Sequence, residues 1–196
     1  MAKLIYVMNT SLDCYVEDEQ GGFGWSAPNE EVNSYINELS SSVGTYLYGR
    51  RMYEAMVFWE SAYAAHNLPQ FLLDWARLWQ AATKIVYSRS LTEARSTRTR
   101  VVREFDAKAV GRLKADAEHN ISINGPELAA HALRAGLVDE IQMIVHPVVV
   151  GGGKRFFPVG VRADLELVEE RGFRNGVIGL RYHLRPQAKS PIEETS

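Results

Sequence analysis

The sequence lacks the features that mark secreted and membrane-bound proteins. It has one cysteine, Cys14, so no disulfide can form within the chain, and nothing in its composition suggests secretion. No apolar run approaches the roughly 18 residues that a membrane-crossing helix needs. The apolar run near the N-terminus is too short for a signal peptide and is better interpreted as a first β-strand. We therefore expect a cytoplasmic protein that does not bind membranes.

The sequence also lacks a strong excess of either charge and a clustered set of metal ligands. Its 22 lysines and arginines against 24 acidic residues give a formal net charge of −2, which argues against a protein built to bind nucleic acid. The five histidines are scattered without the spacing of metal ligands, so no metal site is expected. No serine lies in the Gly-x-Ser-x-Gly turn of many hydrolases. A metal enzyme or a serine hydrolase therefore finds little support.

What the chain does contain is the composition of one globular domain. Hydrophobic residues make up 46% of its 196 residues and charged residues 23%, an ordinary balance for a globular protein. No repeat or linker divides the sequence, so we expect a single domain over residues 1–186. Residues 187–196, with their proline, serines and acids, are expected to form a disordered tail.

Short runs of β-forming residues alternate with amphipathic stretches along most of the chain. This alternation predicts an α/β fold with a mostly parallel sheet of about eight strands, covered on both faces. Segment 9–24 is polar, contains glycine and lacks helical periodicity, so we expect a long loop there. Trp75 and Trp79 lie on one helical face, as in a core or a subunit contact. Asn175-Gly176 between two alternating runs predicts an antiparallel C-terminal hairpin.

Three turns follow strands whose carboxyl ends should meet at one edge of such a sheet. They are Gly49-Arg50-Arg51, Ser88-Arg89 and Asn124-Gly125-Pro126. Ligands of parallel sheets bind beyond this edge. Gly125 suits a tight turn and Pro126 suits the first position of a helix, whose outward-facing N–H groups would favour a phosphate. A purely structural turn is the alternative interpretation.

Five motifs, in this order, give the chain a family resemblance over residues 3–185. They are SLDC (11–14), LYGRRMYE (47–54), KIVYS (84–88), NGPELA (124–129) and AGLVDEIQMIVHPVVVGGG (135–153). The set resembles the dihydrofolate reductase-like family, and within it the reductase domain of the riboflavin pathway, the C-terminal part of a bifunctional deaminase-reductase. The resemblance implies a three-layer sandwich and an NADPH-dependent transfer of hydride to a pterin-like or pyrimidine-type heterocycle.

The resemblance also implies roles for individual residues. Glu30 would be the catalytic carboxylate, with Glu31 as the alternative, and Asp13 and Tyr15 would contact the substrate. Trp25 would lie near the nicotinamide. Arginine forks bind phosphate more strongly than a helix N-terminus does, so they would select NADPH over NADH. The remaining cofactor contacts would come from the three turns, namely Gly49, Arg50, Arg51, Ser88, Arg89, Asn124, Gly125, Pro126, Glu127, Leu128 and Ala129.

Three positions depart from the family pattern and keep two functions open. Cys14 replaces a glycine, Met52 replaces a threonine, and Ile123 replaces an acid that the riboflavin-pathway enzymes use for substrate. The chain is therefore either an NADPH-dependent reductase or an NADP(H)-binding protein without pterin or pyrimidine reductase turnover. Glu30 and its neighbour also have a structural alternative, because acids complement a helix N-terminus. The long apolar strands predict a homodimer in either case.

Overall fold

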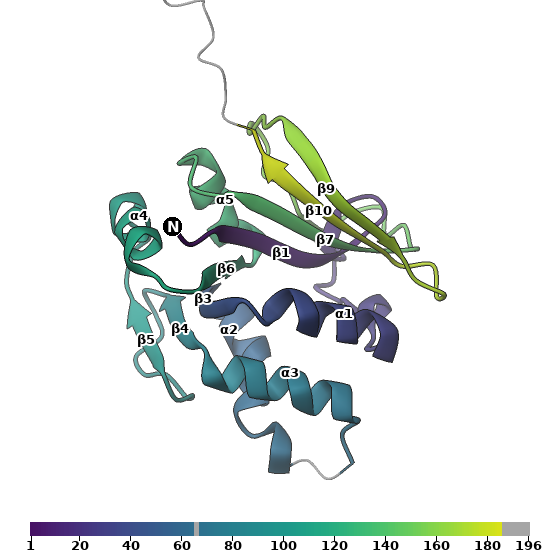
Figure 1. Cartoon of the computed structure of the whole chain (residues 1–196), viewed down its shortest axis with the longest axis horizontal. Helices are drawn as coiled ribbons and strands as arrows, with labels where there is room; N and C mark the ends of the chain where they lie inside the picture. The colour runs from purple at the N-terminus through teal and green to yellow at the C-terminus, as the bar shows by residue number, and fades with distance from the viewer. Residues whose placement is uncertain (65–66, 186–196) are drawn as a thin grey trace, which may run out of the picture.

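The computed structural model describes residues 1–64 and 67–185, so the predicted tail at 187–196 lies outside the described residues (Figure 1). Its centre is an eight-stranded sheet in the order β5-β4-β3-β6-β1-β7-β10-β9. Neighbours are parallel from β5 to β7, and β10 and β9 join antiparallel. The sheet confirms the predicted architecture. Its strands are β1 (Leu4–Ser11), β3 (Val43–Gly49), β4 (Thr83–Tyr87), β5 (Thr99–Val102), β6 (Asn120–Asn124), β7 (Glu140–His146), β9 (Leu165–Gly172) and β10 (Ile178–Leu184).

Helices cover both faces of the sheet and complete the three layers (Figure 1). On one face lie α4 (Ala107–Asp116) and α5 (Pro126–Arg134). The other face carries α1 (Glu30–Ser40), α2 (Arg50–Met56) and α3 (Gln70–Ala81). The described part of the chain also has three short 3₁₀ turns, namely η1 (Gly24–Ser26), η2 (Val57–Glu60) and η3 (Ala62–Ala64).

Local side chains fix where two of these helices begin. Asn29 precedes α1, and its side chain accepts a hydrogen bond from the N–H of Val32 at 3.2 Å. Asp106 precedes α4 and accepts from the N–H of Lys108 at 2.8 Å. Each cap satisfies an N–H group that has no partner inside its helix, so both helix starts could be predicted from sequence.

Alternate residues of the central strands enter separate cores on the two faces. Leu47 and Ile123 pack beneath α4 and α5, whereas Tyr46 and Tyr48 pack against α2 and α3. This follows from the two-residue period of a β-strand. Trp79 is fully buried and donates its indole N–H to the Tyr48 hydroxyl at 3.2 Å. The core interpretation of the tryptophan pair is therefore right, since Trp75 packs into the same cluster.

The prediction of a long loop over residues 9–24 is partly wrong. β1 continues through Ser11, because Asn9–Ser11 pair with the last residues of β7. Thr10 is buried, and its hydroxyl bonds to the backbone carbonyls of Ser11 and Tyr15, so polar residues can extend the strand. Residues 15–17 form a further strand, β2 (Tyr15–Glu17), which pairs with β8 (Lys154–Arg155). That partner lies far along the chain and leaves no local signal.

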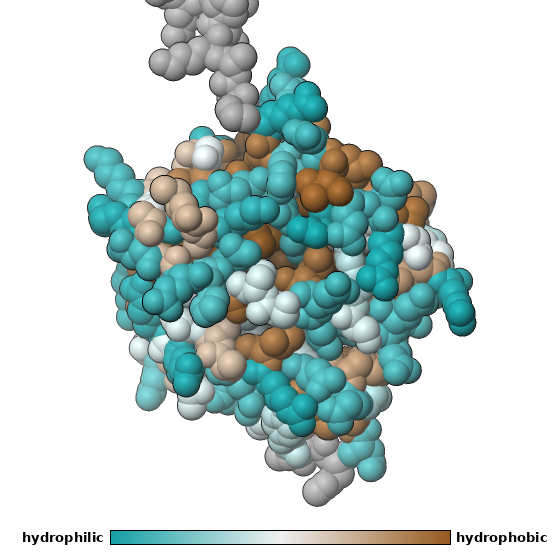
Figure 2. All heavy atoms as spheres, viewed as in Figure 1, coloured by the Kyte–Doolittle hydropathy of each residue, from teal (hydrophilic) through white to brown (hydrophobic). Residues whose placement is uncertain are grey.

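The C-terminal hairpin forms at the predicted Asn-Gly turn. Gly176 has φ +84, and the N–H of Phe173 bonds to the carbonyl of Val177 at 2.9 Å. Large apolar side chains of the hairpin, including Leu167 and Ile178, are exposed. Figure 2 shows apolar atoms gathered in the upper right of this face, where Figure 1 places β9 and β10. Within the described residues, no helix is both long and apolar enough to cross a membrane.

Candidate functional site

Strand register brings the three predicted turns together at one edge of the sheet. Gly49, the last residue of β3, pairs with Tyr87, the last residue of β4. On the other side, Tyr48 pairs with Asn124 at the end of β6. The turns that follow β4, β3 and β6 are therefore neighbours beyond the carboxyl ends of parallel strands, where ligands of such sheets bind. We call this edge the carboxyl rim.

The turn between β6 and α5 begins the helix with a glycine followed by a proline. Gly125 has φ +94, a conformation that favours glycine, and Pro126 occupies the first helical position. The Ala129 N–H bonds back to the Gly125 carbonyl at 3.0 Å, so the N–H groups of residues 127 and 128 have no acceptor inside the helix. The side chains of Leu128 and Ala129 are buried in the core. Any contact they make with an anion must therefore use the backbone.

Asn124 supports this turn from below. Its amide nitrogen donates to the Val7 carbonyl at 2.9 Å, and its amide oxygen accepts from the Ser122 hydroxyl at 3.1 Å. The Gly125 N–H points to the sulfur of Met8 at 3.3 Å. These contacts tie the end of β6 to β1. Both the oxygen and the nitrogen of the Asn124 side-chain amide therefore have partners within the fold.

The turn between β3 and α2 lies directly against the turn that begins α5. A Cβ atom placed on Gly125 would lie 3.6 Å from the Cβ of Met52, one turn into α2. Met52, which replaces the family threonine, thus packs under the glycine turn. Arg50 is held by Glu54 at 3.0 Å along the same helix, and Arg51 lies 3.5 Å from the carboxylate of Glu17 in β2.

The turn after β4 is fixed by two side chains. The Ser88 hydroxyl accepts from the N–H groups of Ser90 (3.3 Å) and Leu91 (2.9 Å). The Arg103 guanidinium donates to three backbone carbonyls of the same turn, the shortest bond being 2.7 Å to Leu91. Arg89 is 81% exposed and pairs with Glu104 at 2.9 Å. Two of the three expected phosphate-binding arginines, Arg50 and Arg89, therefore pair with at least partly exposed carboxylates, an interaction worth about 0–1 kcal/mol, whereas Arg51 contacts the largely buried Glu17.

The two predicted substrate residues lie where residues 13–17 contact residues 150–155. We call this pair of segments the clasp. The Asp13 carboxylate accepts from the backbone N–H groups of Val150 (3.2 Å) and Gly151 (2.8 Å). Tyr15 pairs with Arg155 across β2 and β8, and the Arg155 guanidinium lies 5.6 Å from the centre of its ring. Both residues thus fasten the loop after β1 to the glycine-rich turn after β7.

His146, the last residue of β7, contacts Asn9 of β1 and Trp25 of η1, and no role in the site was predicted for it from the sequence. His146 is buried, and its Nε2 lies 3.0 Å from the Asn9 amide oxygen. Trp25 packs edge-on against the imidazole with ring centroids 5.5 Å apart. The indole N–H of Trp25 is buried and has no hydrogen-bond partner among the described residues. Burial lowers the pKa of His146, which keeps the imidazole neutral near pH 7. A histidine at the end of an otherwise apolar strand was the available signal.

Glu30 and Glu31 lie in the first turn of α1. Glu31 accepts from the N–H of Arg174 in the hairpin turn at 3.4 Å. Glu30 is exposed, and no described residue makes a hydrogen bond or ion pair with its carboxylate. The structure thus leaves Glu30 available to a ligand and gives Glu31 a partner in the fold.

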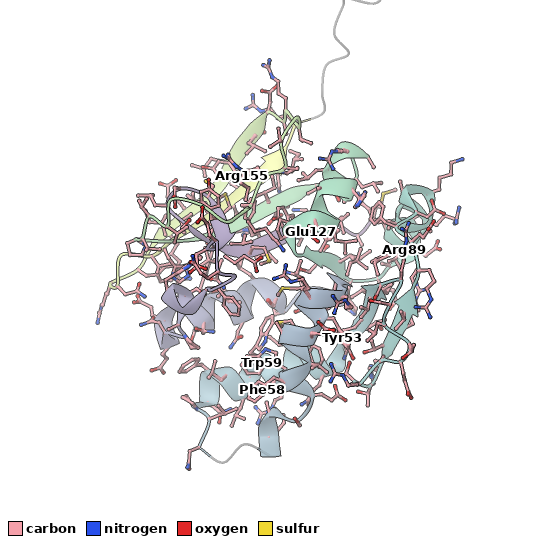
Figure 3. The ribbon with its side chains drawn as sticks, turned by 180° about the vertical axis from the view of Figure 1, so that it is seen from behind. Tyr53, Phe58, Trp59, Arg89, Glu127 and Arg155 are labelled. Atoms are coloured by element: carbon pink, nitrogen blue, oxygen red, sulfur yellow. The ribbon has the colours of Figure 1, made fainter. Side chains whose placement is uncertain are left out.

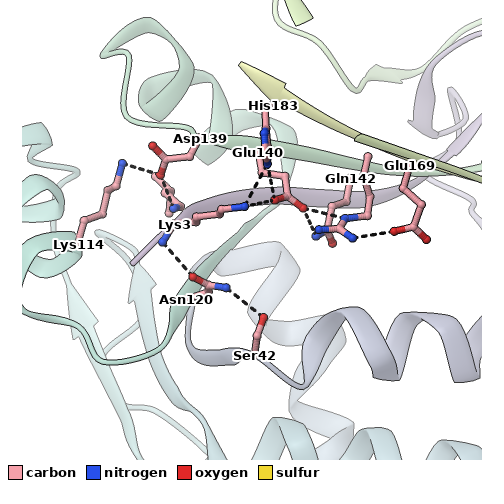
Figure 4. Close-up of polar contacts among 11 residues, drawn as sticks. Lys3, Ser42, Lys114, Asn120, Asp139, Glu140, Gln142, Glu169 and His183 are labelled. Atoms are coloured by element: carbon pink, nitrogen blue, oxygen red, sulfur yellow. Dashed lines mark hydrogen bonds and ion pairs between the residues drawn. The ribbon is translucent and has the colours of Figure 1, made fainter. Parts of the chain in front are cut away.

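Two hollows lie at the opposite, amino edge of the sheet. One, of about 240 Å³, is lined by residues that include Lys3, Glu140 and Arg181, and the other, of about 790 Å³, surrounds Asp139 and His183. Figure 4 shows that the first belongs to an ion-pair network around the buried Glu140 carboxylate. We place the functional site at the carboxyl rim because the amino-edge charges already satisfy one another. No group of three or more metal-ligating side chains gathers among the described residues.

Comparisons with known proteins identify one family. The model of the RibD C-terminal domain matches residues 2–178. The chain is 26% identical over 183 residues to the uncharacterized protein YyaP of Bacillus subtilis, covering 92% of this chain and 94% of that protein.

Two solved structures share the fold. A putative riboflavin biosynthesis protein from Shewanella sp. PV-4 has a TM-score of 0.73 and 20% identity, over 95% of this chain and 100% of that one. A pyrimidine reductase-like protein from Corynebacterium diphtheriae has a TM-score of 0.64 and 16% identity, over 95% and 93%.

Proposed function

The chain belongs to the RibD C-terminal domain family, and from this premise we propose that it is an NADPH-dependent reductase acting on a pyrimidine-type or pterin-like heterocycle. One observation carries the proposal: the turns after β3, β4 and β6 adjoin at the carboxyl rim, with Gly125 packed against α2. That arrangement offers two helix starts and three arginines to one phosphorylated ligand.

The residues present fit a phosphorylated dinucleotide. Gly125 presents no side chain where the chain turns into α5, so a pyrophosphate can approach the N–H groups of residues 127 and 128. Arg50 and Arg51 lie at the neighbouring turn, and Ser88 and Arg89 at the turn after β4 would receive the 2′-phosphate. The carboxylates that pair with Arg50 and Arg89 are 36% and 71% exposed, so phosphate can displace them at small cost.

Bound NADPH would supply the hydride, and the chain's own residues must orient the acceptor and deliver a proton. The unpartnered indole N–H of Trp25, next to His146 and Asn9, is a hydrogen-bond donor that the fold itself leaves unused. A ligand acceptor there would relieve a buried unpaired group, which costs about 1–3 kcal/mol. Glu30 is the carboxyl group that we assign to proton delivery at the heteroatom beside the reduced carbon.

An NADP(H)-binding protein without turnover is the second candidate. It is favoured by Glu30, which no described residue holds in one orientation. The same rim would then bind cofactor without a positioned proton donor. Oxidation of NADPH across a panel of pterins and pyrimidines, measured beside NADPH binding, distinguishes the two.

The binding part of the proposal is tested by arginine substitutions. We expect Arg89→Ala to weaken NADPH about 10- to 100-fold and to leave NADH binding unchanged, because a charge-assisted bond to the 2′-phosphate is worth about 1.5–3 kcal/mol. Arg50→Ala should weaken both cofactors. Arg77→Ala removes a comparable exposed helix ion pair remote from the rim and should change neither. If all three variants bind NADPH as tightly as the unmodified chain does, the proposed site is wrong.

A further inference from the structure

Four charged side chains form a continuous cluster across the carboxyl rim. The Nζ of Lys154 lies 3.0 Å from the Oε1 of Glu17 and 3.0 Å from the Oε1 of Glu127. The same oxygen of Glu17 is 3.5 Å from the Arg51 guanidinium. We call these four residues the mouth cluster. Its members come from β2, β8, α2 and α5, so the cluster joins the clasp to both phosphate-binding turns.

The backbone holds Lys154 in this place. Gly153, directly before it, has φ +122, and a Cβ there would collide with the backbone of Glu17 and Asp18. The close approach lets β2 and β8 pair, with Glu17 opposite Lys154. The lysine ammonium is thus positioned by a strand ladder and a required glycine.

The two carboxylates that contact Lys154 differ in their environment. The side chain of Glu17 is 19% exposed and that of Lys154 is 23% exposed, whereas Glu127 is 78% exposed. Figure 3 labels Glu127 among the side chains that it draws. A largely exposed carboxylate is weakly held, since exposed pairs contribute about 0–1 kcal/mol. Glu127 can therefore leave the lysine without disturbing Glu17, which keeps Lys154 in position.

Glu127 is also the residue whose carboxylate stands at the start of α5. Its own N–H and that of Leu128 have no acceptor inside the helix, and its side chain brings Lys154 to this same turn. A phosphate bound to those N–H groups would meet the carboxylate as a like charge and the ammonium as an opposite charge. Removing the Glu127 carboxylate should therefore strengthen anion binding at this turn, and removing the Lys154 ammonium should weaken it.

We propose that Lys154 is a further ligand for the pyrophosphate of the nicotinamide cofactor, and that Glu127 is a counter-ion which the lysine gives up when the cofactor binds. The inference rests on the proposed function and adds to it. It assigns Lys154, from the glycine-rich segment after β7, to cofactor recognition, and it assigns Glu127 an opposing effect on affinity.

The test is a double-mutant cycle on Glu127→Gln and Lys154→Met, with cofactor dissociation constants measured by tryptophan fluorescence. We expect Glu127→Gln to tighten NADPH about 3- to 10-fold and Lys154→Met to weaken it about tenfold or more. In the double variant the gain from Glu127→Gln should shrink to the part that comes from like-charge repulsion, because there is no lysine for the substitution to release. Both single effects should be equal for NADPH and NADH, which share the pyrophosphate, in contrast to Arg89→Ala.

Matched controls separate this from a general charge effect. Glu166→Gln makes the same charge change at the amino edge, where Glu166 pairs with Arg185, and should leave cofactor affinity unchanged. If Lys154→Met does not fold, the substitution of the exposed Glu127 by Gln still tests whether this carboxylate weakens cofactor binding. Unchanged or weaker cofactor binding in Glu127→Gln, with NADPH bound by the unmodified chain, overturns the inference and leaves the proposed function standing. Failure of the unmodified chain to bind NADPH overturns both.

Discussion

The carboxylate of Asp13 and the backbone N–H of Gly151 are 2.8 Å apart, and a second bond from Val150 makes the contact bidentate. It fastens the loop after β1 to the glycine-rich turn after β7. Hydrogen bonding by Ser11 and by these two N–H groups holds the pKa of Asp13 below its ordinary value. The carboxylate is therefore ionised at neutral pH and acts as an acceptor.

Asp13→Asn should loosen the glycine-rich turn, because an amide offers one acceptor oxygen in place of two. We expect faster hydrogen exchange over residues 147–157 at neutral pH. In the unmodified chain the contact is present above the ordinary carboxyl pKa and is lost as pH falls through the lowered native pKa. Asp116→Asn, at the end of α4, is the control. Unchanged exchange in Asp13→Asn would show that other contacts hold the clasp.

Cys14 occupies a glycine conformation, with φ +64. The backbone strain of a non-glycine residue there is about 1–2 kcal/mol. Cys14→Ala keeps the strain and loses the partly buried thiol, whereas Cys14→Gly removes the strain. We expect Cys14→Gly to be more stable than Cys14→Ala by about 1 kcal/mol in urea unfolding, after the entropy of glycine is subtracted. The reverse order would show that the turn tolerates a side chain without strain.

Trp25→Phe separates a binding role from a packing role. The substitution keeps an aromatic ring against His146 and removes the buried N–H that has no partner. Loss of that unpaired donor offsets the smaller ring, so the free energy of unfolding should change by less than about 1 kcal/mol. We expect NADPH or substrate affinity to fall about 3- to 10-fold. Trp59→Phe, in η2, should leave affinity unchanged, and wild-type affinity in Trp25→Phe would remove the indole from the site.

Glu140 should make stability depend on pH at the amino edge. Its carboxylate is 1% exposed; burial alone would raise its pKa, but hydrogen bonds from Gln142, Arg181 and Lys3 outweigh burial and hold the pKa at about 2 (Figure 4). Because the native pKa is lowered, the stabilisation is complete above about pH 4.5 and is lost as pH falls toward 2.

The matched variant for this network is Glu140→Gln. The substitution leaves Lys3 and Arg181 without their buried carboxylate partner, and it should lower the free energy of unfolding by about 3 kcal/mol at pH 7. The difference from the unmodified chain should shrink between pH 4.5 and pH 2, where the native carboxylate takes up a proton. Urea unfolding at several pH values measures both, and a difference that does not change with pH would contradict the assignment.

Much of the fold could be predicted from sequence because it depends on short-range chemistry. The two-residue period of Tyr46, Leu47 and Tyr48, the cap at Asp106 and the glycine turn at Asn175-Gly176 each involve residues within a few positions of one another. The same kind of local signal predicted that three turns follow the carboxyl ends of strands at one edge of the sheet. The continuation of β1 through buried Thr10 did not, because its hydroxyl partners belong to the folded backbone.

The sequence by itself determined the α/β architecture, the glycine turn at 125 and the basic residues beside the other two turns. Only the tertiary structure decided what those residues face. Lys154 meets Glu127, Asp13 meets Gly151, and His146 meets Asn9 because the register of β1 against β7 and the pairing of β2 with β8 place them together. Register is fixed by burial of whole strand faces, which no local pattern of residues encodes.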